Sequence, residues 1–152
     1  REVICEITLS VFGPVSIDAA IEREFGPLSG TTWKDRKRAD VSSDLDANPA
    51  GCFVAEIDGH VAGFVTTSLD SGTSVGRVLN LGVGEGFQGR GLGKRLLSHA
   101  LDYFESLGLR YSQIETTVSN ERGQRFYPAM GYREVSRKIY YFMELPDRTD
   151  RR

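Results

Sequence analysis

The chain has 152 residues, of which 39% are hydrophobic and 26% charged, and its formal net charge is −2. This length supports one domain with its own core, and the charge argues against a nucleic-acid partner, which would favour a basic surface. We find neither a signal peptide nor a long apolar run, so we expect a cytoplasmic protein without a membrane partner. Cys5 and Cys52 form no metal-binding spacing, which predicts reduced thiols and no metal site.

The first third of the chain predicts a strand followed by two helices. Apolar and polar residues alternate from Val3 to Phe12, which is typical of a strand. Helical spacing from Ile17 to Phe25 predicts the first helix. The second helix runs from about Trp33 to Asp46, and Thr32 with Asp35 forms a capping box with Asp in place of Glu.

The middle of the chain predicts three strands in succession. Cys52 to Ile57 and Val61 to Leu69 alternate in character around Asp58-Gly59, which is a strong hairpin signal. After a Gly/Ser-rich turn, the third strand runs from roughly Gly76 to Val83. We therefore expect an antiparallel meander.

The last third predicts a helix, a strand, a short helix and one or two final strands. The first helix places apolar side chains on one face and ends before Gly108. Tyr111 to Val118 reads as a strand, Asn120 to about Met130 as a short helix, and Tyr132 to Leu145 as the final strands.

The predicted order is β-α-α-β-β-β-α-β-α-β(β), an α/β (mixed α+β) fold with helices on the faces of a mixed sheet. The strands that flank the long helix are expected to run parallel. We predict one domain over residues 1–146 and a charged, disordered tail over residues 147–152.

A glycine-rich loop between the third strand and the long helix is the strongest functional signal. Six glycines lie from Gly82 to Gly93, and a loop of this kind before a helix N-terminus suits a phosphate group. Gly84-x-Gly86-x-x-Gly89 matches a dinucleotide fingerprint but lacks the acidic residue that should follow. A Walker loop fails because Lys94 is out of frame. Two interpretations of the loop remain. One is a connector that binds no ligand, and the other is a phosphate-binding loop with the pattern Gln88-x-x-Gly91-x-Gly93.

That last pattern resembles the acyl-CoA pyrophosphate signature, Gln/Arg-x-x-Gly-x-Gly/Ala, of the GNAT family of N-acetyltransferases. A second motif, Asn120-x-x-Gly123-x-x-Phe126-Tyr127-x-x-x-Gly131-Tyr132, is similar to a family motif with Ala at the Gly123 position. Leu81-Gly82-Val83 matches the family's strand end before the loop. Pro128, inside the short helix, departs from the expected pattern because proline removes a backbone donor.

The resemblance implies a GNAT-like acyl-CoA N-acyltransferase fold with a central pair of splayed parallel strands, and acetyl-CoA as co-substrate without a metal. The loop amides would hold the pyrophosphate and the strand end would hold the pantetheine arm. The cofactor-binding residues that this implies are Leu81, Gly82, Val83, Gln88, Gly89, Arg90, Gly91, Leu92, Gly93, Lys94 and Asn120.

Two residues are candidates for the chemistry. Tyr127 could donate a proton to the leaving thiolate, because a phenol with a pKa of about 10 is protonated at neutral pH. The alternative is a packing tyrosine. Glu115 is expected in a central strand on the face opposite its apolar neighbours, where a carboxylate is costly to bury unless it is used. It could serve as a base or anchor the amine, and Asn120 could hold the arm or a water molecule, or only cap the helix.

The sequence says less about the molecule that would accept the acetyl group. The motifs are most similar to those of ribosomal-protein alanine and N-terminal acetyltransferases, which implies direct acetyl transfer to a primary amine of a protein or peptide. The alternatives are a polyamine-like or aminoglycoside-like amine, or a non-catalytic acyl-CoA-binding module. Trp33, the charged residues 34–38 and Tyr140-Tyr141 could line the amine side, or serve as core and solvated surface. The protein would be a monomer or a homodimer.

Overall fold

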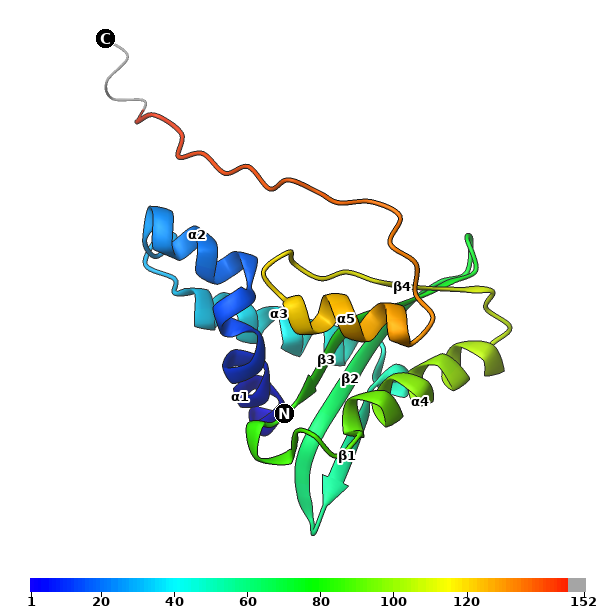
Figure 1. The fold of residues 1–152 in the computed structure, drawn as a ribbon. Coiled ribbons are helices and arrows are strands. Elements are labelled where there is room, and N and C mark those ends of the chain that lie inside the picture. Colours follow the sequence, from blue (N-terminus) through cyan, green and yellow to red (C-terminus); the bar gives the residue numbers. More distant parts are fainter. Residues whose placement is uncertain (148–152) are drawn as a thin grey trace.

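The computed structural model describes residues 1–147, which form a mixed sheet flanked by helices (Figure 1). The elements are α1 Glu2–Phe12, α2 Ile17–Phe25, α3 Trp33–Ala47, β1 Phe53–Ile57, β2 His60–Asp70, β3 Val75–Val83, α4 Leu92–Ser106, β4 Tyr111–Ile114 and α5 Glu121–Ala129. Within this part of the chain, no single helix has both the length and the hydropathy of a membrane span, although the bent pair α1 and α2 passes that test jointly.

The sheet has the order β1-β2-β3-β4, with the first three strands antiparallel and β4 parallel to β3. This confirms the predicted meander and the predicted parallel pair. The hairpin between β1 and β2 turns at Asp58 and Gly59, whose φ angles of +50° and +78° are both left-handed. Two consecutive left-handed residues match the twist of the strands that they join, which explains the strength of the Asp-Gly signal.

Helices cover both faces of the sheet, and β2 supplies side chains to both. On one face, Leu97 and Phe104 of α4 pack against Val65 and Val78. On the other face, where α1 and α3 lie (Figure 1), Phe64 is buried in a cluster with Ile4, Ile7 and Val41. Phe64 and Val65 are both fully buried, because successive residues of a strand point to opposite faces.

The first predicted strand is wrong, since Val3 to Phe12 forms α1. The buried residues Ile4, Ile7 and Thr8 recur at helical spacing, and they face α3 and β2. Val3 and Leu9 supplied the apparent alternation, but Val3 is 47% exposed and packs into no core. The apolar residues of this segment fit the period of a strand as well as that of a helix. Contact with Val41 and Phe64 stabilises the helix.

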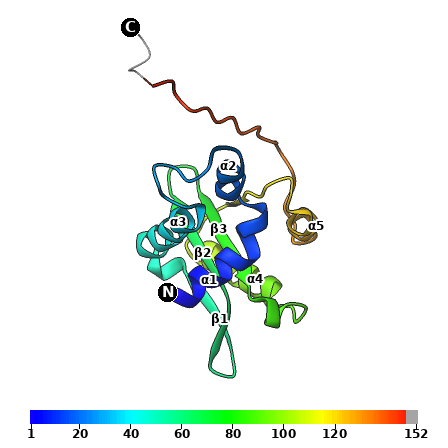
Figure 2. The same ribbon diagram turned by 90° about the vertical axis from the view of Figure 1, so that its left-hand side faces the viewer.

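The end of the chain also differs from the expectation. The predicted strand from Tyr111 to Val118 ends at Ile114, and the predicted strands from Tyr132 to Leu145 do not form. Residues 133–147 form an extended segment that leaves the end of α5 (Figure 2) and passes α2, where the Phe142 ring lies 4.9 Å from that of Phe25. The observed order over the described residues is therefore α-α-α-β-β-β-α-β-α. Of the predicted tail, 147–152, all but Asp147 lies outside the described residues. The 1–146 domain boundary stays a prediction.

Candidate functional site

The sheet opens between β3 and β4, next to the glycine-rich loop. Pairing of the two strands runs from Val75 with Tyr111 to Val78 with Ile114 and stops there. Among residues 1–147, the remaining part of β3, through Val83, is paired only with β2. This is the splay that the family resemblance implies.

Backbone groups of β3 face the opening. The Val83 carbonyl accepts a hydrogen bond from Gln88 Nε2 at 3.0 Å, so it points away from β2. The next amide, that of Gly84, donates to the Ala62 carbonyl on the β2 side at 2.8 Å. Because adjacent residues of a strand alternate in direction, Leu81 and Val83 both direct their N–H groups towards the open edge. An extended ligand there could extend the sheet by hydrogen bonding.

The glycine-rich loop places the N-terminus of α4 at the same opening. Gly89 and Gly91 have φ angles of +80° and +76°, and Gly91 caps the helix without a side-chain hydrogen bond. The first amides of α4 therefore have no partner within the helix, and the helix dipole adds positive potential. A Cβ atom at Gly89 or Gly91 would meet no atom within 4 Å, so the turn requires glycine for its backbone angles while the space above it is open.

Basic side chains surround this helix end. Lys94, Arg122 and Arg125 line the opening, and none forms an ion pair with a carboxylate of residues 1–147. Arg122 Nη1 donates instead to Gln88 Oε1 at 2.7 Å. Cations beside a helix N-terminus are unfavourable on their own, so the arrangement favours an anionic ligand.

These features meet in one cleft of about 890 Å³ between α1, the loop and α5. A phosphate-binding end and a strand edge thus share one cavity. The predicted residues that line the cleft are Leu81, Val83, Gln88, Gly89, Gly91, Leu92, Gly93, Lys94, Asn120 and Tyr127.

Tyr127 lies on the α5 side of the cleft. Its ring centroid is 5.5 Å from that of Phe126 and 6.2 Å from that of Tyr132. Burial raises the pKa of the Tyr127 hydroxyl, and Tyr132 raises it further. The phenol therefore holds its proton at neutral pH. Helix α5 continues through Pro128 to Ala129, so the proline does not interrupt the turn that carries Tyr127.

Asn120 caps α5. Its Oδ1 accepts a hydrogen bond from the Gly123 amide at 3.1 Å, and its Nδ2 donates to Thr116 Oγ1 at 2.8 Å. The capping interpretation is therefore confirmed, because the side chain satisfies an orphan amide of the first turn. A ligand-binding role for Asn120 stays a prediction.

Glu115 lies outside the residues that line the cleft. It follows the last residue of β4, its side chain is 70% exposed, and its carboxylate is 3.9 Å from Lys138 Nζ. The expectation of a desolvated carboxylate in a central strand is therefore wrong, since β4 ends earlier and lies at the sheet edge. A role as base or amine anchor stays a prediction.

Gly82 and Arg90 also lie outside the cleft lining. Gly82 lies beneath α1, where a Cβ atom would be 3.0 Å from Phe64 and 3.2 Å from Ile7. Its missing side chain therefore lets α1 approach the sheet. The Arg90 guanidinium lies over the Phe87 ring, 5.8 Å from its centroid.

The candidate acceptor-side residues are dispersed. Trp33 packs over Gly13, where a Cβ atom would be 2.5 Å from the ring, and it lines a second, open cleft of about 650 Å³. Ser10 lines both clefts, so they adjoin at α1. Tyr140 and Tyr141 are exposed on the C-terminal segment.

Sequence reasoning missed the contributions of two elements to the cleft. Arg122 and Arg125 escaped notice although their i, i+3 spacing places them on one helical face. The α1 residues Ser10, Val11 and Phe12 escaped because α1 was predicted as a strand. Among residues 1–147, no three His, Cys, Asp or Glu side chains are grouped closely enough to hold a metal ion.

Comparison with known proteins relates this arrangement to a family. The sequence model of the acetyltransferase (GNAT) family matches residues 17–132. The chain is 34% identical over 121 residues to mycothiol acetyltransferase of Streptomyces avermitilis, covering 80% of this chain and 38% of that protein. It is 34% identical over 87 residues to the ribosomal protein bS18 alanine N-acetyltransferase of Salmonella typhimurium, covering 55% of this chain and 56% of that protein.

A solved structure agrees in fold. The aminoglycoside acetyltransferase AAC(6')-Iy, in complex with a bisubstrate analogue made of CoA and acetylneamine, has a TM-score of 0.58 and 26% identity, with 73% of this chain and 80% of that one covered. The predicted acyl-CoA N-acyltransferase fold is thus confirmed. The chain spans about two fifths to a little over half the length of the two curated relatives named above.

Proposed function

Because the chain belongs to the acetyltransferase (GNAT) family, we propose that it is an acetyl-CoA-dependent N-acetyltransferase that transfers acetyl directly to a primary amine. One observation carries the proposal. The N-terminus of α4, which no side chain caps, shares a single cleft with the open edge of β3 and the protonated phenol of Tyr127. A phosphate-binding end, a hydrogen-bonding edge and an acid are the parts that acetyl transfer from a thioester requires.

The cleft fits coenzyme A by charge and by shape. The amides of residues 89–94 would hold the pyrophosphate, with Lys94 and Arg122 supplying charge. The N–H groups of Leu81 and Val83 would bind the pantetheine arm along the open edge of β3. Acetyl-CoA would supply the activated acetyl group as a thioester.

The protein's part in the chemistry is to stabilise charge and deliver a proton. An N–H group at Leu81 or Val83 would stabilise the negative charge that develops on the thioester oxygen as the amine attacks. The Tyr127 hydroxyl would donate its proton to the departing thiolate. Neither Cys5 nor Cys52 lines the cleft, which supports direct transfer over an acyl-enzyme on a cysteine.

Glu115 would act on the amine rather than on the thioester. An amine must lose its proton before it attacks, and Glu115 could accept that proton through water or hold the ammonium group. Its exposed position beyond β4 favours a solvent-linked role over direct contact. Asn120, whose side chain caps α5 at the cleft wall, would orient the arm or a water molecule there.

The names of the relatives point to different molecules: mycothiol, the alanine of ribosomal protein bS18 and an aminoglycoside. We infer a primary amine that reaches the cleft beside α1, where Ser10 lines both cavities.

The two free thiols favour the cytoplasm, because disulfides are rare there.

Thiol release tests the proposal. Acetyl-CoA is mixed with the full chain and a panel of peptide amino termini, lysine peptides, polyamines and aminoglycosides, and free CoA is titrated with a thiol reagent. We expect turnover with at least one class of amine and loss of turnover in Tyr127→Phe. Tight CoA binding without turnover on any amine would identify a binding module instead.

A further inference from the structure

Strand β3 has an irregularity at the point where the sheet opens. Thr66 of β2 pairs with Asn80, and the next residue of β2 pairs with Val78. Leu79 is thus an extra residue that has no partner in β2. The pairing of β3 with β4 also ends at Val78. Because a bulge of this kind bends a strand and increases its twist, it lies where β3 turns away from β4.

The bulge changes which residues of β3 face the cleft. Val78 and Asn80 are two residues apart and would share a face in a regular strand. Val78 packs in the cluster on the α4 face, whereas the Asn80 side chain bonds to α3 on the other face. Without the extra residue, Leu81 and Val83 would point away from the cleft that they line. The register beyond the bulge therefore determines how the open edge presents its groups.

Two hydrogen bonds fix that register. Asn80 Nδ2 donates to Thr66 Oγ1 and to Asp44 Oδ2, each at 2.8 Å. Thr66 is fully buried and Asn80 is 8% exposed, so water competes little for these groups. A hydrogen bond to a carboxylate is also among the stronger ones. The Asn80 side chain therefore ties the first residue after the bulge both to β2 and to α3.

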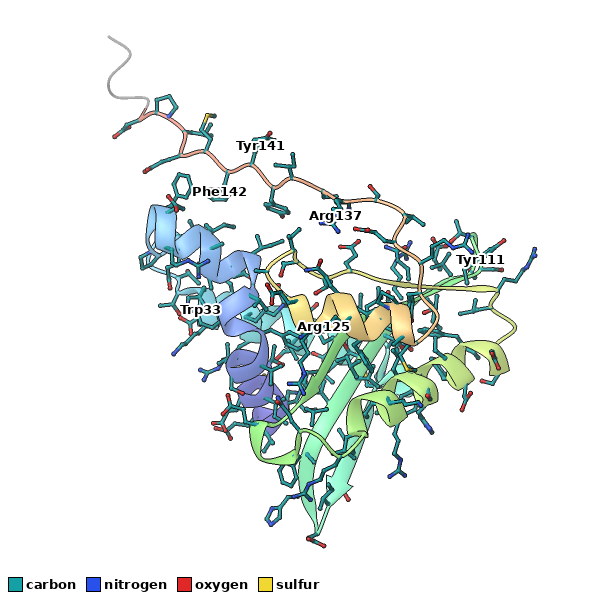
Figure 3. All side chains as sticks on the ribbon, in the orientation of Figure 1. Trp33, Tyr111, Arg125, Arg137, Tyr141 and Phe142 are labelled. Carbon is teal, nitrogen blue, oxygen red and sulfur yellow. The ribbon has the colours of Figure 1, made fainter. Side chains whose placement is uncertain are left out.

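The three tied side chains do not touch the ligand cleft. Asp44, Thr66 and Asn80 are all outside the residues that line it. Helices α3 and α5 pack on opposite faces of the sheet (Figure 2), and Figure 3 labels Trp33 at the start of α3 and Arg125 on α5. An effect of Asn80 on a ligand must therefore act through the backbone that Asn80 holds.

The peptide group after Asn80 carries the N–H group of Leu81, which faces the open edge of β3. In acetyl-CoA the pantetheine arm joins the pyrophosphate to the thioester, so the thioester lies at the end of the arm farthest from the glycine-rich loop. Leu81 is two residues farther from that loop than Val83. The N–H group of Leu81 is therefore the donor nearer the thioester oxygen.

We infer that Asn80 is a positioning residue, whose bonds to Thr66 and Asp44 hold the bulge in the register that directs the Leu81 N–H group at the thioester oxygen. The inference rests on the proposed function. A donor stabilises the developing negative charge best when it is already aimed at the oxygen. A buried amide with two fixed partners sets that direction, whereas an apolar side chain of similar size packs without directional bonds.

The carbonyl stretch of bound acetyl-CoA tests the inference without requiring turnover. The full 152-residue chain is mixed with acetyl-CoA labelled with carbon-13 at the acetyl carbonyl, and the infrared band of the label is recorded. Donation from the Leu81 N–H group lowers the frequency in the parent chain. Asn80→Leu keeps the volume and neither bond, so the band should move towards its frequency in an apolar solvent. Thr66→Val removes one bond and should move it in the same direction by less.

Turnover and binding supply the second readout. In Asn80→Leu, kcat should fall about 10- to 100-fold while the Kd for CoA stays within about twofold, because the pyrophosphate site is unchanged. Asp44→Asn, which keeps an acceptor for Asn80, should retain both the band and kcat. The matched control is Asn48→Ala. Asn48 Nδ2 donates to Thr67 Oγ1 at 3.1 Å, so it also ties the end of α3 to β2, but outside the cleft lining. This variant should lose stability and keep the band and kcat.

The outcomes separate the inference from the proposed function. A band shift that depends on Asn80, without turnover on any amine, would reject acetyl transfer and keep the placement of the Leu81 N–H group. Turnover with the same band in the parent chain, Asn80→Leu and Thr66→Val would overturn the inference alone. An equal change in Asn48→Ala would also overturn it, because it would show a general loosening. A parent chain that does not bind acetyl-CoA would overturn both, and Thr66→Val decides if Asn80→Leu does not fold.

Discussion

Gln88 and Val83 connect the glycine-rich loop to the open end of β3, through a hydrogen bond of 3.0 Å from Gln88 Nε2 to the Val83 carbonyl. The same amide group accepts from Arg122 Nη1 at 2.7 Å, so one side chain ties together the strand, the loop and α5. Gln88 therefore acts within the cleft as a brace as well as a lining residue.

Gln88→Ala removes both hydrogen bonds. We expect the Kd for CoA to rise roughly tenfold, since a hydrogen bond to a charged group contributes about 1.5–3 kcal/mol and a neutral one about 1. Isothermal titration measures the change. Gln113→Ala is the control, because Gln113 is exposed on β4 and its side-chain amide donates a hydrogen bond to Glu115, outside the cleft lining. Equal affinities of the two variants for CoA would contradict the bracing role of Gln88.

Arg122 and Arg125 are expected to contribute long-range attraction for the pyrophosphate. The double variant Arg122→Gln, Arg125→Gln should weaken CoA binding about 3- to 10-fold at low salt and by less at high salt, because screening shortens the reach of exposed charges. The control, Arg110→Gln, changes a cation that lies over the Tyr111 ring outside the cleft. The same loss of affinity at every salt concentration would indicate a structural effect instead.

The sequence predicted best where a local pattern determines the structure. The hairpin at Asp58-Gly59, the Thr32 cap and the apolar face of α4 depend on neighbours a few residues apart, and all are present. Helix α1 depends instead on distant partners, since both a strand and a helix period fit its residues and Val41 selects between them. The segment from Tyr132 to Leu145 has strand-like composition but no strand partner among residues 1–147, and composition cannot show whether a partner is in reach.

The candidate site also has parts that local sequence patterns predict and parts that depend on distant contacts. The loop and Tyr127 were predictable because motif spacing places them, and the structure brings them to one cleft. The wall formed by α1 was not, because its residues became visible only once the helix was correctly placed. Glu115 was misjudged because its expected burial depended on how far β4 extends, which the splay from β3 determines.

Gly91 and Gly108 offer a matched pair at the two ends of α4. Both have left-handed φ angles, +76° and +74°, and a Cβ atom at either would meet no atom within 4 Å. Gly91→Ala and Gly108→Ala should therefore destabilise the protein alike, by about 1–2 kcal/mol from the backbone angle. Only Gly91→Ala should weaken CoA binding. Thermal melts with and without CoA measure both effects, and a CoA shift unchanged in Gly91→Ala would contradict the loop's role.

Tyr127→Phe is expected to lower kcat about 10²- to 10⁴-fold, the usual contribution of a general acid, while the Kd for CoA stays the same. The sign of the pH dependence follows from the phenol. It acts when protonated, and because burial raises its pKa, activity should persist to a pH above about 10, the ordinary tyrosine value. This alkaline limb should disappear in Tyr127→Phe. Tyr132→Phe loses the bond to Ser112 and the smaller contribution of its hydroxyl to the raised Tyr127 pKa, and it should retain kcat at neutral pH.

Glu115→Gln tests the proposed base. The loss in kcat/KM, roughly 10²-fold for a general base, should be greatest below the pKa of the acceptor, about 8 for a peptide terminus and about 10.4 for lysine, where most of the amine carries its proton. The substitution also breaks the contact with Lys138, so Lys138→Met is the necessary control. That variant loses the same ion pair, which at this exposure is worth about 0–1 kcal/mol, and keeps the carboxylate. A pH–rate profile of each variant decides. A pH-independent loss in Glu115→Gln would assign the residue to amine anchoring, and an equal loss in Lys138→Met would remove Glu115 from the chemistry.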